Sequence, residues 1–311
     1  MSCQPSPGQT TTCTALHYRI VAVPLRPAQI SDSSQIAGTV DERKAATWTE
    51  EKGLRIFAVP AGYSSAQGVG LNSSGEVIGV AVDRDGDRHR ALVFRRGKPE
   101  VLAGERSKAT AINDDGEIVG SAKLAGKAVS GAVLWKRGKA IALGGCCGGT
   151  ATGINRRGQV VGEIYDEEGS YSAFLWDEAH GVRRLGTSKS YSSAIAINEA
   201  GHVLVQEFSE GIFLYQDGQF AHLNLSAKYT SDVRAISDCD AVVGGFGPFA
   251  DAYRAFVWDK NLGFRDLNDL VPGGSGWKLE VATSINNRGE IVGWGDYQGK
   301  DGAGFLLVPQ N

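Results

Sequence analysis

A repeated unit of about 40 residues constrains this chain more than any other feature of its sequence. Its clearest copy runs from Ala109 to Gly144 and contains four short β-like runs separated by turn residues. An Ala-Ile-Asn-x-x-Gly-x-x-x-Gly core, which includes Asn113 and Gly116, precedes an apolar run that ends in Trp135. Aligned on the Asn position, seven copies are found, with Ser31, Asn72, Asn113, Asn155, Asn198, Ser237 and Asn286 at that position.

This period predicts a β-propeller. Four strand-like runs in about 40–45 residues are typical of one blade, because a lone four-stranded sheet cannot bury both faces and must pack against neighbours. The runs alternate or are short and β-branched, without a helical period. Gly contributes 42 of 311 residues, which indicates many tight turns. We therefore predict an all-β, seven-bladed β-propeller of four-stranded blades.

Each part of a copy has a predicted role. The first run is small, as in Ala109–Ile112, which suits the innermost strand, where blades crowd around the axis. The Asn-x-x-Gly segment then turns the chain, since Asn bonds its own backbone and Gly accepts a positive φ. The third run ends in a large aromatic residue predicted to fill the space between blades: Trp48, Phe94, Trp135, Trp176, Tyr215 or Trp258.

The two ends of the chain carry complementary pieces of one repeat. The seventh copy stops after its third run, Gly304–Val308, whereas an orphan run at residues 18–24 precedes the first copy. We expect this N-terminal run to complete the last blade as its fourth strand, because closure removes an exposed sheet edge. The prediction is a flexible leader at residues 1–17 and a single propeller domain at residues 18–311.

Charge and hydropathy exclude several classes of function. The 32 Lys and Arg residues are interleaved with 35 Asp and Glu residues, so no basic stripe predicts binding to nucleic acid. No apolar run approaches the roughly 18 residues of a membrane span, and residues 1–17 lack the apolar core of a signal peptide. We expect a mature, monomeric chain whose partner is an unidentified protein or glycan.

The five cysteines show no zinc-site spacing, so neither a metal nor a cofactor is predicted. Cys3 and Cys13 flank a leader segment rich in Pro, Ser, Thr and Gln, where a disulfide would favour an oxidising compartment; two unpaired thiols are the alternative. The adjacent Cys146 and Cys147 lie between glycine pairs. We interpret them as a loop-stiffening vicinal disulfide or an incidental thiol pair rather than as redox or metal chemistry.

Several motifs together resemble a known family. The Ala-Ile-Asn-x-x-Gly-x-Ile-Val-Gly core, followed by Ser-Ala-Phe-Leu-Trp at 172–176 or Arg-Ala-Phe-Val-Trp at 254–258, is similar to the HAF-repeat family of probable extracellular bacterial proteins. The segment Asp266–Pro272, which leads through Trp277 into Asn286, is similar too. The resemblance covers nearly all of residues 18–309 and implies export and a repeat fold. The family's His-Ala-Phe histidine is replaced here by Arg90, Gly131, Ser172, Arg254 and Ala303, so no role of a histidine ring is carried over.

The predicted ligand site lies on one face of the propeller. Loops that join the fourth to the first run and the second to the third share what we call the upper face, and the Asn-x-x-Gly turns form the lower face. Irregular loops of a repeat scaffold usually carry its binding site. Aromatic rings there would stack on a sugar or peptide, with basic groups beside them. The predicted residues are Tyr63, Arg90, Lys108, Cys146, Cys147, Tyr191, Tyr229, Arg254 and Trp277. For Trp277 the alternative is packing of its insertion against the last blade.

Catalytic motifs are missing from the sequence, and no catalytic residue is predicted. Neither Gly-x-Ser-x-Gly, nor His-Glu-x-x-His, nor a phosphate loop is present. The alternating carboxylates of Asp83–Asp87 would suit calcium, but a hairpin turn is the favoured interpretation, as a solvated hairpin is for the acidic residues 166–168. The sequence thus favours a non-enzymatic extracellular or periplasmic scaffold that binds a protein or glycan. A loop-borne lyase or hydrolase, with its site over the axial channel, is the alternative.

Overall fold

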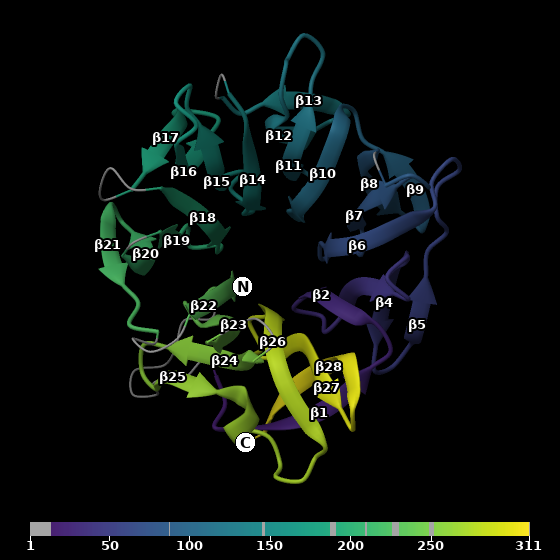
Figure 1. Ribbon diagram of the computed structural model, residues 1–311, viewed down its shortest axis with the longest axis vertical. Coiled ribbons are helices and arrows are strands. Elements are labelled where there is room, and N and C mark those ends of the chain that lie inside the picture. The colour runs from purple at the N-terminus through teal and green to yellow at the C-terminus, as the bar shows by residue number, and fades with distance from the viewer. Residues whose placement is uncertain are drawn as a thin grey trace.

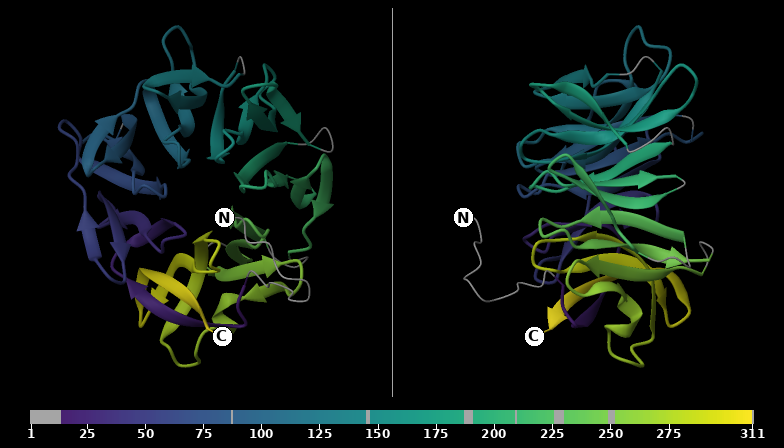
Figure 2. Two further views of the ribbon diagram at one scale, coloured as in Figure 1. Left: turned by 180° about the vertical axis from the view of Figure 1, so that it is seen from behind. Right: turned by 90° about the vertical axis from the view of Figure 1, so that its left-hand side faces the viewer.

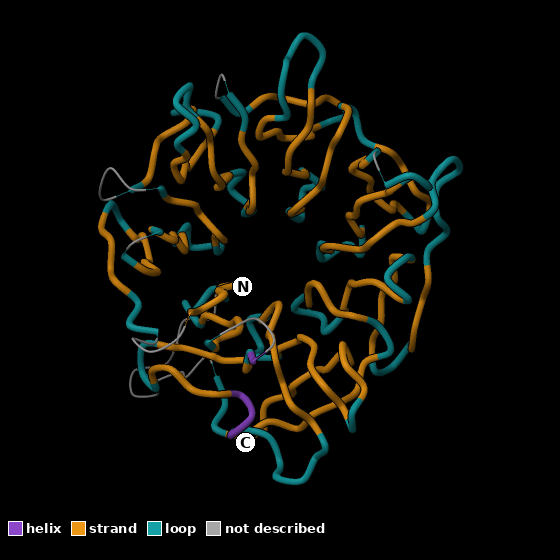
Figure 3. The backbone as a smooth tube through the Cα atoms, in the orientation of Figure 1, coloured by secondary structure: helices purple, strands orange, loops and turns teal. Residues whose placement is uncertain are grey.

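The chain forms an all-β fold in which sheets surround a central axis (Figure 1). The computed structural model describes residues 14–86, 88–144, 147–186, 191–208, 210–225, 230–248 and 252–310. These residues form 28 strands, and strand colours dominate the tube in Figure 3. A short helix, η2 (Leu267–Asp269), follows one of them. The prediction of an all-β fold of four-stranded antiparallel sheets is therefore confirmed.

Strands that follow one another in the chain form antiparallel groups of four. The first groups are β2 (Arg26–Ile30), β3 (Ile36–Val40), β4 (Lys44–Thr49) and β5 (Gly53–Ile56), then β6 (Ser65–Leu71), β7 (Val77–Val82), β8 (His89–Arg95) and β9 (Lys98–Val101). Next come β10 (Glu105–Ile112), β11 (Ile118–Lys123), β12 (Gly131–Lys136) and β13 (Lys139–Ala142), then β14 (Gly149–Ile154), β15 (Val160–Tyr165), β16 (Tyr171–Asp177) and β17 (Gly181–Leu185). They are followed by β18 (Ser192–Ile197), β19 (Val203–Glu207), β20 (Gly211–Gln216) and β21 (Gln219–His222), then β22 (Thr230–Ile236), β23 (Val242–Gly247), β24 (Arg254–Asp259) and β25 (Gly263–Asp266).

The remaining group joins the two ends of the described chain. Its strands are β26 (Trp277–Ile285), β27 (Ile291–Tyr297), β28 (Lys300–Gln310) and β1 (His17–Val23). β1 pairs antiparallel with β28 from His17 opposite Gln310 to Val23 opposite Gly304. Tyr18 is fully buried there, and its backbone N–H donates to the Leu270 carbonyl at 2.9 Å. Figure 2 shows β1 lying beside the C-terminal strands in both views.

Every innermost strand carries a β-bulge at the same place in the repeat, a feature the sequence analysis does not predict. The register shifts centre on the residue three before the Asn position, for example between Ala109 and Ala111. The corresponding shifts lie between Pro27 and Gln29, Gly68 and Gly70, Ala151 and Gly153, Ala194 and Ala196, Val233 and Ala235, and Ala282 and Ser284. A bulge adds local twist, so its recurrence shapes all the inner strands around the axis in the same way.

The hydrophobic core lies between neighbouring blades. One cluster joins Ile78 and Val93 of the β6–β9 blade with Ile118 and Trp135 of the β10–β13 blade. Trp135 is 4% exposed, and its indole N–H donates to the Ala103 carbonyl at 2.8 Å, so the ring bridges the two blades as predicted from its place in the repeat. Packing between blades therefore buries the faces that a single sheet leaves exposed.

The repeated Asn links each hairpin to the next blade. Asn113 is 4% exposed, and its Oδ1 accepts from the N–H groups of Asp115 at 3.2 Å and Glu117 at 3.0 Å. Its Nδ2 donates to the Glu117 carboxylate at 2.9 Å and to the Asn155 carbonyl, in the next blade, at 3.1 Å. Among the described residues the same link to the following blade runs from Asn72, Asn113, Asn155, Asn198 and Asn286.

Replacing Asn113 by Ala should lower the free energy of unfolding by about 2–3 kcal/mol, because two backbone N–H groups and a buried carbonyl lose their partner. Urea denaturation measures this loss. Ser31→Ala is the matched control, because Ser31 occupies the same repeat position but bonds within its own hairpin, to Ser33 and Gln35. The control should lose less than about 1 kcal/mol. Equal losses would contradict a role for the Asn amide between blades.

Candidate functional site

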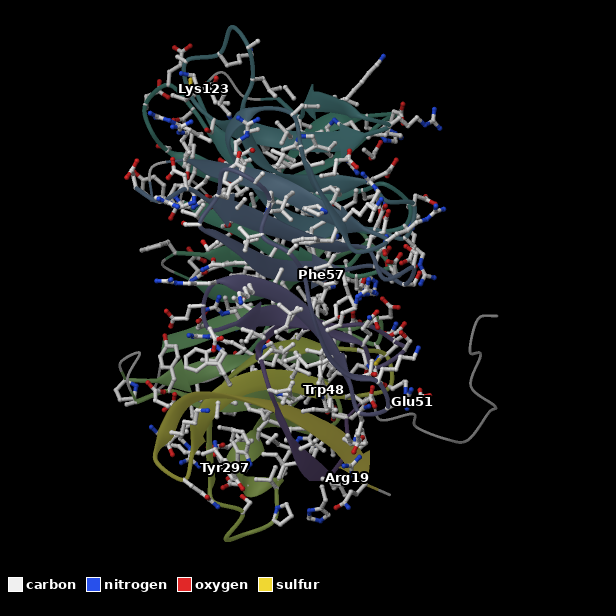
Figure 4. All side chains as sticks on the ribbon, turned by 90° about the vertical axis from the view of Figure 1, so that its right-hand side faces the viewer. Arg19, Trp48, Glu51, Phe57, Lys123 and Tyr297 are labelled. Atoms are coloured by element: carbon white, nitrogen blue, oxygen red, sulfur yellow. The ribbon has the colours of Figure 1, made fainter. Side chains whose placement is uncertain are left out.

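The predicted upper-face residues are spread around the ring rather than gathered in one place. In the edge-on view of Figure 4, Lys123 and Tyr297 lie on the left, which is the upper face, whereas Glu51 and Arg19 lie on the right, which is the lower face. Tyr63 is half-buried and packs on a core cluster of the first two blades. Lys108 is exposed on β10, and Arg90 is half-buried at the start of β8. Tyr229 and Cys146 lie outside the described residues.

Two predicted residues have structural partners. Trp277 stacks on Tyr297, with ring centroids 4.6 Å apart, and meets the edge of Phe305 at 6.0 Å. The ring therefore packs its segment against the last blade, which was the alternative interpretation of Trp277. Arg254 donates from Nε to the Asp266 carboxylate, which ties β24 to the end of β25. Trp277 and Arg254 thus both contact other residues of the propeller itself.

The structure brings aromatic residues together where the β14–β17 blade meets the β18–β21 blade. We call Tyr165, Tyr171, Tyr191 and Phe208 the aromatic patch. The rings of Tyr165 and Tyr171 lie 5.9 Å apart, edge to face, and those of Tyr171 and Tyr191 lie 5.0 Å apart. The Phe208 N–H donates to the Tyr191 carbonyl at 3.0 Å. Tyr191 is 47% exposed and Phe208 is 74% exposed, so the patch presents apolar rings to solvent.

Strand ends position these rings. Tyr165 ends β15 and Tyr171 begins β16, so the two residues are partners in the antiparallel register. Tyr191 precedes β18, and Phe208 follows β19. Sequence reasoning found Tyr191 as a site residue but missed Tyr165 and Phe208. A signal was available, because each of these follows its repeat Asn, Asn155 or Asn198, by ten residues.

A carboxylate lies beneath the aromatic patch. The Tyr165 hydroxyl donates to Glu163 Oε1 at 3.0 Å. Burial raises the pKa of the Tyr165 and Tyr171 hydroxyls above the ordinary value, and the Glu163 charge raises the pKa of both further. Both phenols therefore remain protonated donors at neutral pH. The site offers ring faces, hydroxyl donors and one carboxylate acceptor, which suit a polar ligand with apolar surfaces.

The loop that contains Cys147 borders the same patch. Cys147 is disulfide-bonded. The Tyr165 N–H donates to the Gly148 carbonyl at 3.2 Å. A Cβ on Gly148 would lie 2.9 Å from Tyr165 Cδ2, and Gly148 has φ +122°, so only glycine fits this approach. The loop of the predicted residue Cys147 is thus joined to the predicted residue Tyr191 through Tyr165 and Tyr171.

Two cavities lie along the propeller axis. The upper cavity has a volume of about 580 Å³ and the lower one about 510 Å³. Their linings share the residue that precedes the Asn position in six copies: Ile30, Ile112, Ile154, Ile197, Ile236 and Ile285. These aliphatic side chains therefore lie where the upper and the lower chamber meet.

A second ring of hydrogen bonds surrounds the lower chamber, built by the residue that follows each Asn position. Glu199 N–H donates to Asp238 at 2.9 Å, and Asp238 N–H donates to Asn287 at 3.0 Å. The described residues contain five such links between blades. Arg156 keeps the backbone bond to Glu199, but its side chain donates from Nε to the Asp114 carboxylate at 2.8 Å, where the side chains of the five links accept from backbone N–H groups.

The pKa values of two carboxylates beside Arg156, those of Asp114 and Glu199, are shifted in opposite directions. Burial favours the neutral form of Asp114, but hydrogen bonds from Ser73 and the charge of Arg156 outweigh burial and hold the pKa of Asp114 below its ordinary value. Burial raises the pKa of Glu199, and the Asp238 charge adds to this, although the Arg156 N–H and charge act against it. The charges around the opening of the lower chamber, which we call the lower mouth, therefore influence one another's pKa values.

Other candidate sites gain no support. No group of three or more His, Cys, Asp or Glu residues suited to a metal occurs in the described part of the chain. Asp87 of the calcium-like segment lies outside that part, while Asp83 is paired with Arg88 at 3.1 Å. The Asp166 carboxylate accepts from the Ser170 N–H at 2.8 Å, as in an ordinary hairpin turn. Within the described ranges, no helix is both long and apolar enough to cross a bilayer.

Comparisons with known proteins identify the fold. No family model matches the sequence, and a search of curated proteins finds no match. The β-propeller domain of the Trilobed protease from Pyrococcus furiosus matches with a TM-score of 0.56 and 16% identity, over 78% of this chain and 81% of that one. Virginiamycin B lyase from Staphylococcus aureus matches with a TM-score of 0.59 and 10% identity, over 94% of this chain and 100% of that one. YCF48 bound to D1 peptide matches with a TM-score of 0.53 and 12% identity, over 94% of this chain and 97% of that one. The fold is a β-propeller.

These similar propellers include enzymes or parts of enzymes as well as a peptide-bound protein, so the fold alone does not select between catalysis and binding. The HAF-repeat resemblance stays a prediction, because no family model matches the chain. The function must be argued from the site itself.

The raised pKa of Glu199 makes stability pH-dependent. The folded state holds this proton more tightly than the unfolded state, so wild-type stability falls as pH rises above the ordinary value of 4.5 towards the folded pKa. Glu199→Gln should therefore gain stability relative to wild type between pH 4 and pH 7, as measured by urea denaturation at several pH values. Glu167→Gln, at an exposed hairpin position, is the control and should show no such trend. A pH-independent difference for Glu199→Gln would contradict the assignment.

Proposed function

We propose that this propeller is a non-enzymatic binding scaffold outside the cytoplasm, whose upper face binds a glycan or a protein segment through the aromatic patch. The observation that carries this proposal is the exposure of Phe208 and Tyr191 beside half-buried, hydrogen-bonded Tyr165. Exposed aromatic rings on a rigid support bury much area at low entropic cost when a ligand docks. Glu163 and the tyrosine hydroxyls would give a polar ligand its orientation.

Support for binding over catalysis on the upper face comes from the upper cavity of the axial channel. The alternative function, a lyase or hydrolase with its site over this channel, needs an acid and a base near the substrate. Of the described residues that line the upper cavity, Arg26 and Arg234 are the only ionisable ones. Guanidinium groups stay protonated and do not serve as proton carriers at neutral pH. Binding is therefore the better-supported function.

The scaffold itself is proposed to be a closed ring of seven blades. The 28 described strands, in groups of four, correspond to this number, and the pairing of β1 with β28 supports closure of the last blade by the N-terminal strand. A closed ring leaves the loops of the upper face fixed relative to one another, which suits a preformed binding surface. A crystal structure with six or eight blades would contradict this proposal.

Two variants test the aromatic patch. Phe208→Ala and Tyr191→Ala should each weaken binding to ligands found on glycan and peptide arrays by about tenfold or more, while thermal stability stays unchanged. Ile56→Ala is the matched control, because Ile56 on β5 is 47% exposed, as is Tyr191, but lies on the outer edge of another blade. Arrays on which all three variants bind like wild type would rule out the patch.

The proposed location, extracellular or periplasmic, rests on oxidised cysteines. Cys147 is disulfide-bonded, and Cys239 is disulfide-bonded as well. Structural disulfides persist in oxidising compartments and are rare in the cytosol. In protein purified from its native source without reductant, Cys147 and Cys239 should resist alkylation until a reductant is added, as read by mass spectrometry. Alkylation of both thiols before reduction would contradict the proposed location.

A further inference from the structure

The axial channel is electrically asymmetric. The upper cavity is lined by Arg26 and Arg234, with no carboxylate among its described lining residues. The lower cavity is lined by four carboxylates and one guanidinium, those of Asp32, Asp114, Glu199, Asp238 and Arg156. Anions therefore meet positive charge at the upper end of the channel and negative charge at the lower end.

Arg26 is held in place but keeps its hydrogen-bond donors. Its guanidinium carbon lies 4.2 Å from the centroid of the Trp294 ring, which fixes the group by a cation–π contact. Trp294 also lines the upper cavity. No hydrogen bond joins the Arg26 guanidinium to any residue that the structure describes. A stacked arginine with free N–H groups is a typical receptor for a carboxylate, sulfonate or phosphate oxygen.

Arg234 lies on the other side of the β26–β28 blade from Arg26. Its Nε donates to Asp232 Oδ2 at 3.0 Å, and its Nη2 contacts the same oxygen, so one edge of the guanidinium is anchored. Asp232 is outside the cavity lining. The contacts of Arg234 with described residues use only Nε and Nη2, so its other amino group has no partner among them. The β22–β25 and β2–β5 blades thus place one arginine on each side of the β26–β28 blade.

The rest of the upper cavity is uncharged and combines polar with apolar groups. Its lower boundary is the ring of six isoleucines shared with the lower cavity, and the hydroxyls of Thr110, Thr152 and Thr283 are already bonded to backbone carbonyls of the next blade. A volume of about 580 Å³ holds a small organic molecule. A ligand with one anionic group near the arginines and an apolar body above the isoleucines matches this lining.

We propose that the upper cavity is a binding site for a small organic anion with an apolar portion, held by Arg26 and Arg234. The site goes beyond the aromatic patch, which lies at the strand ends of other blades, and the two are separately testable. The anion reaches it from the upper face, because the acidic lower mouth repels it.

The test uses anilinonaphthalene sulfonate, an aromatic sulfonate whose fluorescence rises in apolar sites, with neutral phenylnaphthylamine as its uncharged counterpart. Wild type should bind the sulfonate saturably at one site and the neutral compound much more weakly. Arg26→Gln and Arg234→Gln should each weaken sulfonate binding by about tenfold, the value expected for one lost charge-assisted hydrogen bond. Binding should also weaken as salt rises from about 0.05 M to about 0.5 M.

Two controls separate this site from others. Arg156→Gln removes a guanidinium from the lower mouth and should leave sulfonate binding unchanged. Phe208→Ala removes the main ring of the aromatic patch and should also leave it unchanged, whatever its effect on glycan or peptide binding. The inference fails if both Arg26→Gln and Arg234→Gln bind the sulfonate like wild type, if the neutral compound binds equally well, or if Phe208→Ala abolishes the signal. Circular dichroism confirms that each variant is folded.

Discussion

One buried amide bond, repeated around the axis, sets the geometry on which the rest of this propeller depends. The Asn side chain closes its own hairpin through Oδ1 and reaches the next blade through Nδ2, so the turn and the spacing between blades have one cause. The link is missing where Ser31 occupies the Asn position, and there other contacts join the blades. Gln29 Oε1 accepts from the Leu71 N–H at 2.9 Å, and Lys44 pairs with Ala66, which fuses these two blades into one sheet. Loss of the amide at Ser31 is thus compensated by local contacts between these two blades.

Much of the fold was predictable because the determinants are local and repeated. The sequence predicts a turn at Asn113, a positive φ at Gly116 and a ring between blades at Trp135. The structure shows all three. The hydrogen bond from the Asn amide to the next blade was not predictable. The preference of Asn for turns already explains why Asn recurs at this position of the repeat, so nothing in the sequence indicated a second role. The candidate site was predicted only in part. Tyr191 was found as an irregular loop residue, whereas Phe208 was missed because it directly follows a regular strand.

The two faces differ in what their side chains are free to do. On the lower face, residues such as Asp238 and Asn287 vary between copies but are bonded from blade to blade, so their variation serves the scaffold. On the upper face, Phe208 is 74% exposed, and its ring gains little from folding because most of its apolar area stays in water. An exposed ring of this size next to Tyr191 favours association with another molecule. Difference between copies is therefore a guide to function only where the differing residue is not used to hold blades together.

The same distinction explains why the axial channel can carry a site. The recurrent bulge places the residue three before each Asn position at the channel wall. Where that residue is Thr, as at Thr110, Thr152 and Thr283, its hydroxyl bonds a carbonyl of the next blade and is committed to the scaffold. At Arg234 the equivalent residue is tied to Asp232 of its own strand instead, so its charge is not used between blades. A repeat position that elsewhere stabilises the ring thereby becomes available for a ligand, and the cost is one missing inter-blade hydrogen bond of about 1 kcal/mol.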